Sequence, residues 1–597
     1  MLSDDVFAFG PKISDRAAWE KLGQRPAFHA TIARAERLSA EPIRELPDDL
    51  FMEFSRTGNR ANYEHLYFDR TGRLTPLVIA ECIEHRGRFV PAITQLIRAL
   101  DEQNTWMLPA HDPNLKNFHG EARDVDLFSS ALACDLANAV WLLGDSLDSE
   151  TREQVDQNVR RRVLDPFREM VTGVRKPIWW IAANNNWNAV CLANVLGAAL
   201  ATFPDRQDRA VFAAAAEEDS LNYLDGFAVD GYCEEGLGYW NYGFGNYVRL
   251  CELLYQTTAG RVDCFDRDKV RAIAQYPAKL MIADGVYPAY GDVHLDATPT
   301  PALVDFLDRR FQLPGPSSAG AGEISTSLGG SLGETMMMAC PNSATGKAAA
   351  APQGPALRDW FDDAEVLTCR PGSSDGQGLA VSIKGGRNGV NHGHDDLGSF
   401  VLVVGRTPLL VDPGTEVYTA RTFSKDRFKS MVINSFGHNV PLVGDQLQIS
   451  TSRAHVKILS REFSDSVDTL AMDLTSAYAV PQLTSLQRTF TYDRRGGGSL
   501  TIQDDCRFAT PEPFGIQFIT FGQWKQISPT EMVVWEGGQV VRIDFDAGGG
   551  ELDFTSQVID EDLPGKRQPI HINVDLKTPA MIARLKSVIR ATLSPKY

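Results

Sequence analysis

The sequence predicts an α+β multidomain protein with a helical N-terminal domain and a C-terminal antiparallel β-sandwich. Two observations carry this prediction. Apolar residues recur at helical spacing through the first half, with no strand-like segments between them. Beyond residue 340 the pattern changes to short strand-like segments with Gly- and Asp-rich turns about every ten residues, which is typical of a sandwich and not of βαβ units.

The helical half shows its periodicity in segments separated by loops of Gly, Pro, Asn and Asp. A succession of helices without a short repeat motif indicates a toroid or solenoid of α-hairpins. The expected helices cover 77–100, 124–143, 155–171, 187–203, 210–224, 239–255, 270–282 and 301–311.

The stretch NSATGKAAAAPQGP at 342–355, made of small residues and proline, indicates a linker between the two halves. We therefore predict a helical domain over 1–345, a linker over 346–360 and a β-sandwich over 361–597. The segment 578–593 fits either a final helix or the last strands. The expected strands are 365–369, 379–383, 399–404, 408–411, 454–459, 470–474, 487–492, 499–504, 516–521, 532–535 and 539–545.

The composition excludes several classes of partner. A formal net charge of −18 argues against nucleic acid, which requires a basic surface. The apolar stretch 189–203 is interrupted by Asn194 and is shorter than the roughly 20 residues of a membrane span, so we expect no membrane association. Nine scattered cysteines indicate thiols in a reducing compartment. The N-terminus lacks a basic and an apolar signal region, so we expect a cytoplasmic protein, or a periplasmic one if a leader was removed.

The segment NHGHDDLGSF at 391–400 holds two of the eleven histidines, His392 and His394. In an extended chain both imidazoles lie on one face. Asp412 in LLVDPG and His438 in SFGHNV could complete a set of three zinc-type ligands with His394. The alternative is structural: Asp412 caps a turn and the histidines form a satisfied polar cluster.

Four asparagines crowd the start of a predicted helix in WWIAANNNWNAVC at 179–191. One of them fits an N-cap. The amide of Asn186 could also donate hydrogen bonds to a carboxylate or a developing oxyanion.

The glycine-rich segment DGYCEEGLGYWNYGFGNY at 230–247 places Glu235, Tyr239 and Tyr242 on one face if it is helical. Such a face suits sugar stacking and phenol chemistry, although a packed aromatic face is the commoner outcome. For proton transfer, the pKa of Tyr242 would have to be lowered by a cation or a metal.

Taken together, these segments resemble the heparinase II/III-like polysaccharide lyases, which include oligoalginate lyases and heparin and heparan sulfate lyases. The resemblance covers nearly the whole chain. Its strongest parts are NHGHDDLGSFVLVVGRTPLLVDPG, SFGHN and GDQ at 444–446, with NNWNAVC, EEGLGYWNYG and YPAYGD in the helical half. It implies an incomplete (α/α) toroid before the sandwich, and a carbon–oxygen lyase that removes the C5 proton of a uronic acid and expels the O4 leaving group.

The resemblance also assigns roles. It makes Tyr242 the acid or the acid and base, with Tyr239 as the fallback, and it brings His392 into the cleft from the sandwich. Asn186 matches the amide that neutralises the uronate carboxylate. A divalent metal, Zn²⁺ by preference, is expected on His394, Asp412 and His438. The residues expected to contact substrate are Asn185, Trp187, Asn188, Glu235 and Trp240.

The chain departs from the family pattern at one point, because no histidine lies between His119 and His294. The histidine that many relatives carry in the asparagine motif is therefore absent. Three explanations stay open: Tyr242 acts as both base and acid, His392 supplies the base, or Asn188 marks a changed substrate geometry. Tyr418 is a candidate for a second tyrosine contributed by the sandwich.

The function expected is exolytic cleavage of an acidic oligosaccharide or polysaccharide of alginate, glucuronan or glycosaminoglycan type. One alternative is a glycoside hydrolase on an α/α toroid that uses Asp230, Glu234 and Glu235 as carboxylates. The other is a non-catalytic carbohydrate-binding protein. A homodimer is a possible assembly.

Overall fold

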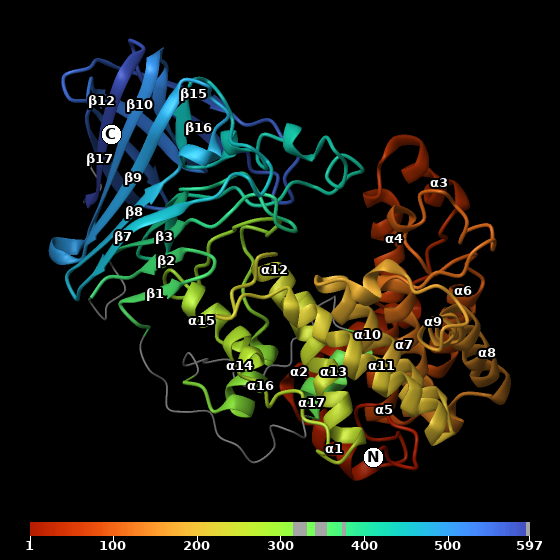
Figure 1. Cartoon of the computed structure of the whole chain (residues 1–597). Coiled ribbons are helices and arrows are strands. Elements are labelled where there is room, and N and C mark those ends of the chain that lie inside the picture. Colours follow the sequence, from red (N-terminus) through yellow and green to blue (C-terminus); the bar gives the residue numbers. More distant parts are fainter. Residues whose placement is uncertain (315–330, 341–354, 373–377, 593–597) are drawn as a thin grey trace.

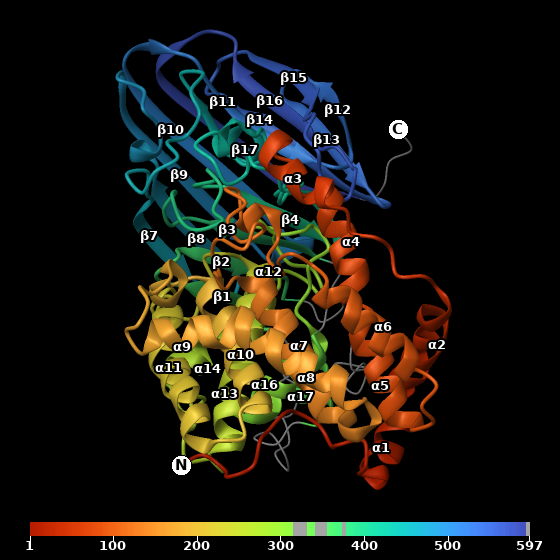
Figure 2. The ribbon, with the colours of Figure 1, turned by 90° about the vertical axis from the view of Figure 1, so that its right-hand side faces the viewer.

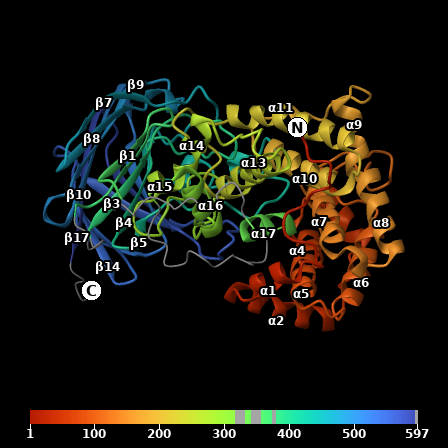
Figure 3. The ribbon, with the colours of Figure 1, turned by 90° about the horizontal axis from the view of Figure 1, so that it is seen from below.

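The computed structural model describes residues 1–314, 331–340, 355–372 and 378–592. Its helices form one body and its strands another, and the two bodies lie side by side (Figure 1). Seen from below, the helices occupy one side of the molecule and the strands the other, with α14, α15 and α16 between them (Figure 3).

The helical domain begins with short helices that the sequence did not predict and continues through longer buried ones. The α-helices are α1 Arg16–Gly23, α2 Pro26–Ala40, α3 Asp48–Thr57, α4 Ala61–Thr71, α5 Leu74–Glu84, α6 Val90–Asp101, α7 Leu127–Leu143, α8 Ser149–Val159, α9 Asp165–Val171, α10 Asn186–Thr202, α11 Arg206–Asp225, α12 Leu237–Tyr239, α13 Gly245–Thr257, α14 Asp268–Ala274, α15 Tyr276–Leu280, α16 Pro301–Phe311 and α17 Leu332–Ala339. Two π-helical turns, Arg160–Leu164 and Trp240–Phe244, interrupt this series.

The centre of the helical domain is α10, which packs against α7, α11 and α13. Almost every residue of α10 from Asn186 to Leu200 is buried, so the helix is covered on every side and shows no amphipathic stripe. The segment Leu127–Ser146, which contains α7, is long and apolar enough to cross a membrane by composition, but 67% of it is buried inside the protein. It is therefore a core helix of the helical domain.

The carboxyl group of Asp135 connects two helices and gives the helical domain a pH dependence. Asp135 on α7 accepts a hydrogen bond from the backbone N–H of Leu332, 2.8 Å away, at the start of α17. Burial raises its pKa to about 7. The folded state therefore holds this proton more tightly than the unfolded chain, in which the pKa is about 3.9. The resulting stabilisation is complete below about pH 4 and is lost as the pH rises through about 7.

We expect Asp135→Asn to remove this pH dependence. Between pH 5 and pH 7 the parent protein should lose on the order of 2 kcal/mol of unfolding free energy relative to the variant. Urea titrations of both proteins at the two pH values measure the difference. Parallel curves for parent and variant would contradict the assignment.

The strands form three antiparallel sheets with the orders β1-β2-β3-β4-β5, β12-β13-β14-β17-β10-β9-β8-β7 and β15-β16-β11-β6. Their bounds are β1 Arg358–Phe361, β2 Val366–Cys369, β3 Leu379–Lys384, β4 Phe400–Val404, β5 Thr407–Leu410, β6 Pro441–Val443, β7 Lys457–Phe463, β8 Val467–Asp473, β9 Leu483–Asp493, β10 Ser499–Glu512, β11 Phe514–Thr520, β12 Gln523–Ser528, β13 Glu531–Glu536, β14 Gln539–Asp546, β15 Leu552–Val558, β16 Ile570–Leu576 and β17 Ala580–Thr592.

The five-stranded sheet is covered on both faces, and this joins the two domains. On β4, Val401 and Val403 pack into the core of the helical domain, whereas Phe400, Leu402 and Val404 pack into the core of the sandwich. Successive side chains of a strand point to opposite faces, so the uninterrupted apolar run FVLVV serves both cores. The domains therefore meet through a continuous apolar interface and not through a linker alone.

The fold class agrees with the sequence prediction, and several elements refine it. The segment 578–593, which by sequence fits a helix or strands, contains strand β17. The predicted helix 77–100 is divided into α5 and α6, because His85 at the C-cap of α5 adopts a left-handed backbone with φ of 51°. Strand β1 begins within the predicted linker 346–360, and residues 346–354 lie outside the described part of the chain. The domain boundaries stay a proposal.

Candidate active site and metal-binding group

The predicted histidines lie where the two domains meet. They come from the loop before β4 and from the segment 411–440 that follows β5, while their partners come from the helical domain around α12 and from the segment between α15 and α16. A long loop of the sandwich reaches toward α3 and α4 (Figure 1), and a quarter-turn view shows these two helices beside the sandwich (Figure 2).

Asp292 of the helical domain is the acceptor shared by the site. Its Oδ2 accepts from Nδ1 of His392 at 2.8 Å, and its Oδ1 lies 3.2 Å from Nε2 of His394 and 2.8 Å from Nη2 of Arg427. The side chain is fully buried. Burial acts to raise the pKa of Asp292, but the two histidines and the Arg427 guanidinium outweigh it and hold that pKa well below its usual range.

His392 and Tyr239 pair across the domain interface. Their rings stack with centroids 4.0 Å apart and an interplanar angle of 24°. The Tyr239 hydroxyl lies 2.9 Å from the hydroxyl of Tyr418, which comes from the sandwich. Burial raises the pKa of Tyr239 well above its usual value, and Tyr418 adds to the shift. Tyr239 therefore stays a protonated phenol at neutral pH.

Asn186 and Glu235 form a second pair beside His392. Glu235 accepts from the amide Nδ2 of Asn186 at 2.9 Å and from its backbone N–H at 3.1 Å. Glu235 Oε1 lies 3.7 Å from Nε2 of His392. Burial raises the pKa of Glu235, while His392 and Asn186 act in the opposite direction. The amide that the family resemblance assigns to a substrate carboxylate is engaged by a carboxyl group of the protein itself.

The regular-helix geometry assumed for Glu235, Tyr239 and Tyr242 is wrong. Glu235 precedes α12, which begins after Gly236 with φ of 87°, and Tyr242 lies in the π-helical turn after α12. A π-turn inserts a residue and rotates the later side chains relative to a regular helix. Tyr239 therefore contacts His392, whereas Tyr242 is 36% exposed and lies within electrostatic reach of Asp126.

The pKa of Tyr242 is shifted in the direction opposite to the one that phenolate chemistry needs. Loss of water around the hydroxyl raises this pKa, and the Cys191 thiol and the Asp126 carboxyl raise it further. The Arg249 guanidinium lowers this pKa, but by less than these influences raise it. The surroundings therefore do not prepare Tyr242 to act as a base.

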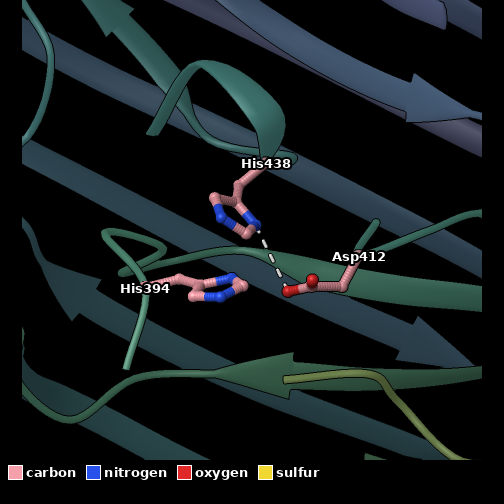
Figure 4. A group of neighbouring side chains, drawn as sticks. All are labelled: His394, Asp412 and His438. Atoms are coloured by element: carbon pink, nitrogen blue, oxygen red, sulfur yellow. Dashed lines mark ion pairs between the residues drawn. The ribbon is translucent and has the colours of Figure 1, made fainter. Parts of the chain in front are cut away.

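His394, Asp412 and His438 form a compact buried group. One ligand atom from each lies within 4.8 Å of the other two, and the three side chains point toward one another (Figure 4). Asp412 Oδ2 is 3.2 Å from Nδ1 of His438. Within the described chain, Nδ1 of His394, both ring nitrogens of His438 and Oδ2 of Asp412 have no hydrogen-bond partner.

These unsatisfied atoms fit a metal ion better than they fit a polar core. Buried polar groups are normally hydrogen-bonded, so a group of two imidazoles and a carboxylate that has an ion pair but lacks hydrogen bonds at these atoms has room for another partner. Nitrogen and oxygen donors of these types bind divalent metals, with zinc as the common occupant. His394 also presents its second nitrogen to Asp292, the usual arrangement of a metal-binding histidine. The structure thus supports a metal site without identifying the metal.

The structure contradicts two of the predicted substrate contacts. The Trp240 ring is fully buried, and its Nε1 donates to the carbonyl of Ile273 at 2.9 Å, so it belongs to the core. Asn188 is also fully buried and donates to backbone carbonyls, at 2.7 Å in the case of Ile181. Both side chains are buried and hydrogen-bonded to the backbone, because α10 and the π-turn lie at the centre of the helical domain.

Of the three other predicted contacts, Glu235 lies beside His392, and the remaining two lie at the start of α10. Asn185 is the N-cap of α10, and its Oδ1 accepts from the backbone N–H of Trp187 at 3.2 Å. The half-buried Trp187 ring contacts Trp179 and His111, with centroids 5.0 and 4.6 Å away. Trp187 therefore stays a candidate for sugar stacking, alongside the exposed Trp179.

Sequence reasoning missed several residues of the site. Asp292 lies within the motif YPAYGD, which carries no sign of its role, and Arg427 belongs to no motif. His111, with Nδ1 2.6 Å from Oδ2 of Asp126, places an imidazole next to the asparagine motif that lacks a histidine of its own. No local signal pointed to His111, because it is distant from the motif in sequence.

The carboxylates proposed for a hydrolase do not converge. Asp230 accepts from the backbone N–H of Tyr232 at 3.1 Å and from that of Asp363 at 3.2 Å. Glu234 pairs with Arg387 at 3.3 Å. Only Glu235 of the three contacts the site. A pair of carboxylates flanking a glycosidic bond is therefore not formed by these residues.

Comparison with known proteins agrees with this architecture. The family model described as Heparinase II/III-like, C-terminal matches residues 370–583. The crystal structure of Heparinase III is 12% identical, with 98% of this chain and 93% of that chain covered and a TM-score of 0.64. The heparan sulfate lyase HepC from Pedobacter heparinus is 11% identical, with 96% and 88% covered and a TM-score of 0.60. No curated protein matches the chain by sequence.

The whole-chain similarity defines the class: an N-terminal incomplete (α/α) toroid followed by an antiparallel β-sandwich, which is a polysaccharide lyase fold. The domain match narrows it further. Residues 370–583 match a heparinase II/III-like C-terminal domain. The prediction of fold class is confirmed, and the predicted family resemblance is supported by the match of the C-terminal domain.

Proposed function

We propose that the protein is a carbon–oxygen lyase that cleaves uronic-acid-containing oligosaccharides by β-elimination. The observation that carries this proposal is the pair of Tyr239 and His392, a phenol and an imidazole from different domains that stack at 4.0 Å. In a lyase fold, this pair supplies both proton-transfer groups that elimination needs. The acidic substrate class follows from the reaction, since the uronate carboxylate is what makes its C5 proton removable.

His392 is the base in this mechanism and Tyr239 the acid. The Nδ1 of His392 is committed to Asp292 as a donor, which leaves Nε2 as the acceptor nitrogen. Nε2 takes the C5 proton, the C5–H electron pair forms the C4–C5 double bond, and the C4–O4 bond breaks. Tyr239 donates its phenolic proton to O4, in keeping with its raised pKa. Exchange with solvent then restores both groups.

We assign the Glu235–Asn186 pair to the uronate carboxylate, because it lies beside His392. A raised pKa increases the protonated fraction of Glu235, and a protonated carboxyl group can donate a hydrogen bond to a carboxylate. Charge that develops on the substrate carboxylate during proton removal would then be stabilised at a site from which water is largely excluded.

A contact between the domains supports exolytic cleavage. The backbone N–H of Ala420 in the sandwich loop donates to the carbonyl of Gly58 at the end of α3, 3.1 Å away. Close by, the Arg60 guanidinium lies 5.9 Å from the centre of the Phe423 ring, and that ring lies 6.1 Å from His392. These contacts between the sandwich loop and the end of α3 would close the substrate site near the reacting groups. Only the end of an oligosaccharide chain would then enter.

A divalent metal, Zn²⁺ by preference, would be held by His394, Asp412 and His438. Bound there, it would supply positive charge and rigidity beside His392. The nine cysteines, all within the described chain, are free thiols, which supports the expected cytoplasmic location.

The test is a panel of alginate, glucuronan, heparan and chondroitin oligosaccharides of defined length. We expect one class to give rising ultraviolet absorbance from the new C4–C5 double bond. Mass analysis of products should show unsaturated monosaccharides or disaccharides from the earliest time points. Flat absorbance on every substrate contradicts the lyase proposal, and long fragments appearing first contradict the exolytic mode.

A further inference from the structure

The carboxylate of Asp292 contacts both histidines of the HGH motif in different roles. It accepts from Nδ1 of His392, the imidazole next to Tyr239, and from Nε2 of His394, the imidazole of the metal-binding group. Opposite ring nitrogens are engaged in the two residues. The free nitrogen is therefore Nε2 in His392 and Nδ1 in His394.

The free nitrogens face different surroundings. Nε2 of His392 lies 3.7 Å from the Glu235 carboxyl, on the side of the proposed substrate carboxylate. Nδ1 of His394 has no hydrogen-bond partner among the described residues. One ring nitrogen of His394 lies within 4.8 Å of ligand atoms of Asp412 and His438, and Nδ1 is the one not engaged by Asp292. One carboxylate thus selects which nitrogen each imidazole presents.

Asp292 also holds the backbone of the motif. Its N–H donates to the carbonyl of His392 at 3.0 Å, and His392 adopts a left-handed backbone with φ of 55°. This conformation is costly for a residue with a side chain and persists where the surroundings impose it. The preceding Gly291 leaves room for the contact, since a Cβ there would come within 2.8 Å of the His392 carbonyl oxygen.

Arg427 completes the environment of the carboxylate. Its Nη2 donates to Oδ1 of Asp292 at 2.8 Å and to the carbonyl of Gly393, between the two histidines, at 3.1 Å. The positive charge of the guanidinium thus balances the negative charge of the fully buried Asp292 carboxylate. The second hydrogen bond holds the Gly393 peptide in place.

We infer that Asp292 is the positioning residue of the site: a single carboxylate from the toroid that sets the tautomers of both sandwich histidines, His392 for proton abstraction and His394 for metal binding. The part that concerns His392 rests on the proposed lyase function. The part that concerns His394 does not, because metal affinity can be measured without a substrate. Because Asp292 lies in the toroid and both histidines lie in the sandwich, the two sites are complete only when the two domains are docked.

The experiment compares Asp292→Asn with Asp284→Asn in the full-length protein. The asparagine keeps the shape of the side chain, but its NH₂ group cannot accept from a histidine N–H. Asp284, 86% exposed and in the same inter-helix region, is the matched control. Zinc affinity is measured by competition with a chromophoric chelator, and kcat and KM on the substrate that the panel identifies. Melting in saturating zinc checks that each variant is folded.

We expect Asp292→Asn to weaken zinc binding about 10- to 100-fold and to lower kcat by roughly 10²-fold or more with KM within about threefold. Asp284→Asn should match the parent in both measurements. Unchanged zinc affinity in a folded Asp292→Asn protein overturns the inference, whatever the enzyme's substrate. Reduced zinc affinity with a parent protein that cleaves nothing sinks only the proposed function. If Asp292→Asn does not fold, Asp292→Ser is measured in the same way.

Discussion

Replacing Tyr239 with phenylalanine should lower kcat by roughly 10²- to 10⁴-fold, the range for removal of a general acid. The ring stays, so stacking on His392 at 4.0 Å and the packing of the interface are preserved. Only the proton donor and its hydrogen bond to Tyr418 are lost, which costs about 1 kcal/mol of stability. KM should change little, because the phenol acts on the leaving oxygen in the transition state.

Tyr242→Phe is the matched control, since it is the same change three residues later. We expect its kcat to stay within about tenfold of the parent, because the groups that act on the Tyr242 hydroxyl, namely Cys191, Asp126, Tyr239 and Arg249, all belong to the toroid. Steady-state rates from ultraviolet absorbance on one defined oligosaccharide decide between the two tyrosines. The reverse ranking, with Tyr242→Phe the more damaged variant, would restore the role that the family resemblance gave to Tyr242.

Replacing His438 with alanine should remove the metal and lower the melting temperature. A ligand that binds only the folded state, at a free concentration 100 times its Kd, stabilises the protein by about 2.7 kcal/mol, and the variant should lack this contribution. Chelation should lower the melting temperature of the parent and leave that of the variant unchanged. His455→Ala, at an exposed histidine of the sandwich, serves as the control.

Metal binding at this group should also weaken on acidification. Burial lowers the pKa of His438, but the Asp412 carboxylate outweighs burial and raises it above 6.5. The metal-free group therefore holds a proton that the metal must displace, so affinity falls as the pH is lowered. Elemental analysis and melting curves across pH check this. A parent protein without metal, melting together with His438→Ala, would show the group to be purely structural.

Part of the site could be predicted because its residues lie close together in sequence. His392 and His394 are separated by one residue, and both contact Asp292, although the stretch forms a turn with a left-handed His392 and not the extended chain that alternation assumes. The predicted grouping of His394 with Asp412 and His438 is present in the structure. The substrate-contact predictions at Trp240 and Asn188 failed because residue type alone does not reveal burial. Both side chains lie inside the toroid, where they donate hydrogen bonds to backbone carbonyls.

The sequence by itself determined the fold class and the grouping of His394, Asp412 and His438, because helical periodicity, strand alternation and short motifs are local properties of a chain. Only the tertiary structure decided which tyrosine meets His392, since the π-turn at Trp240–Phe244 rotates the helix between them. It alone revealed Asp292, whose histidine and arginine partners lie 100 to 135 residues away. Contacts at such separations are fixed by the docking of toroid and sandwich across a shared apolar sheet, and no local pattern encodes that geometry.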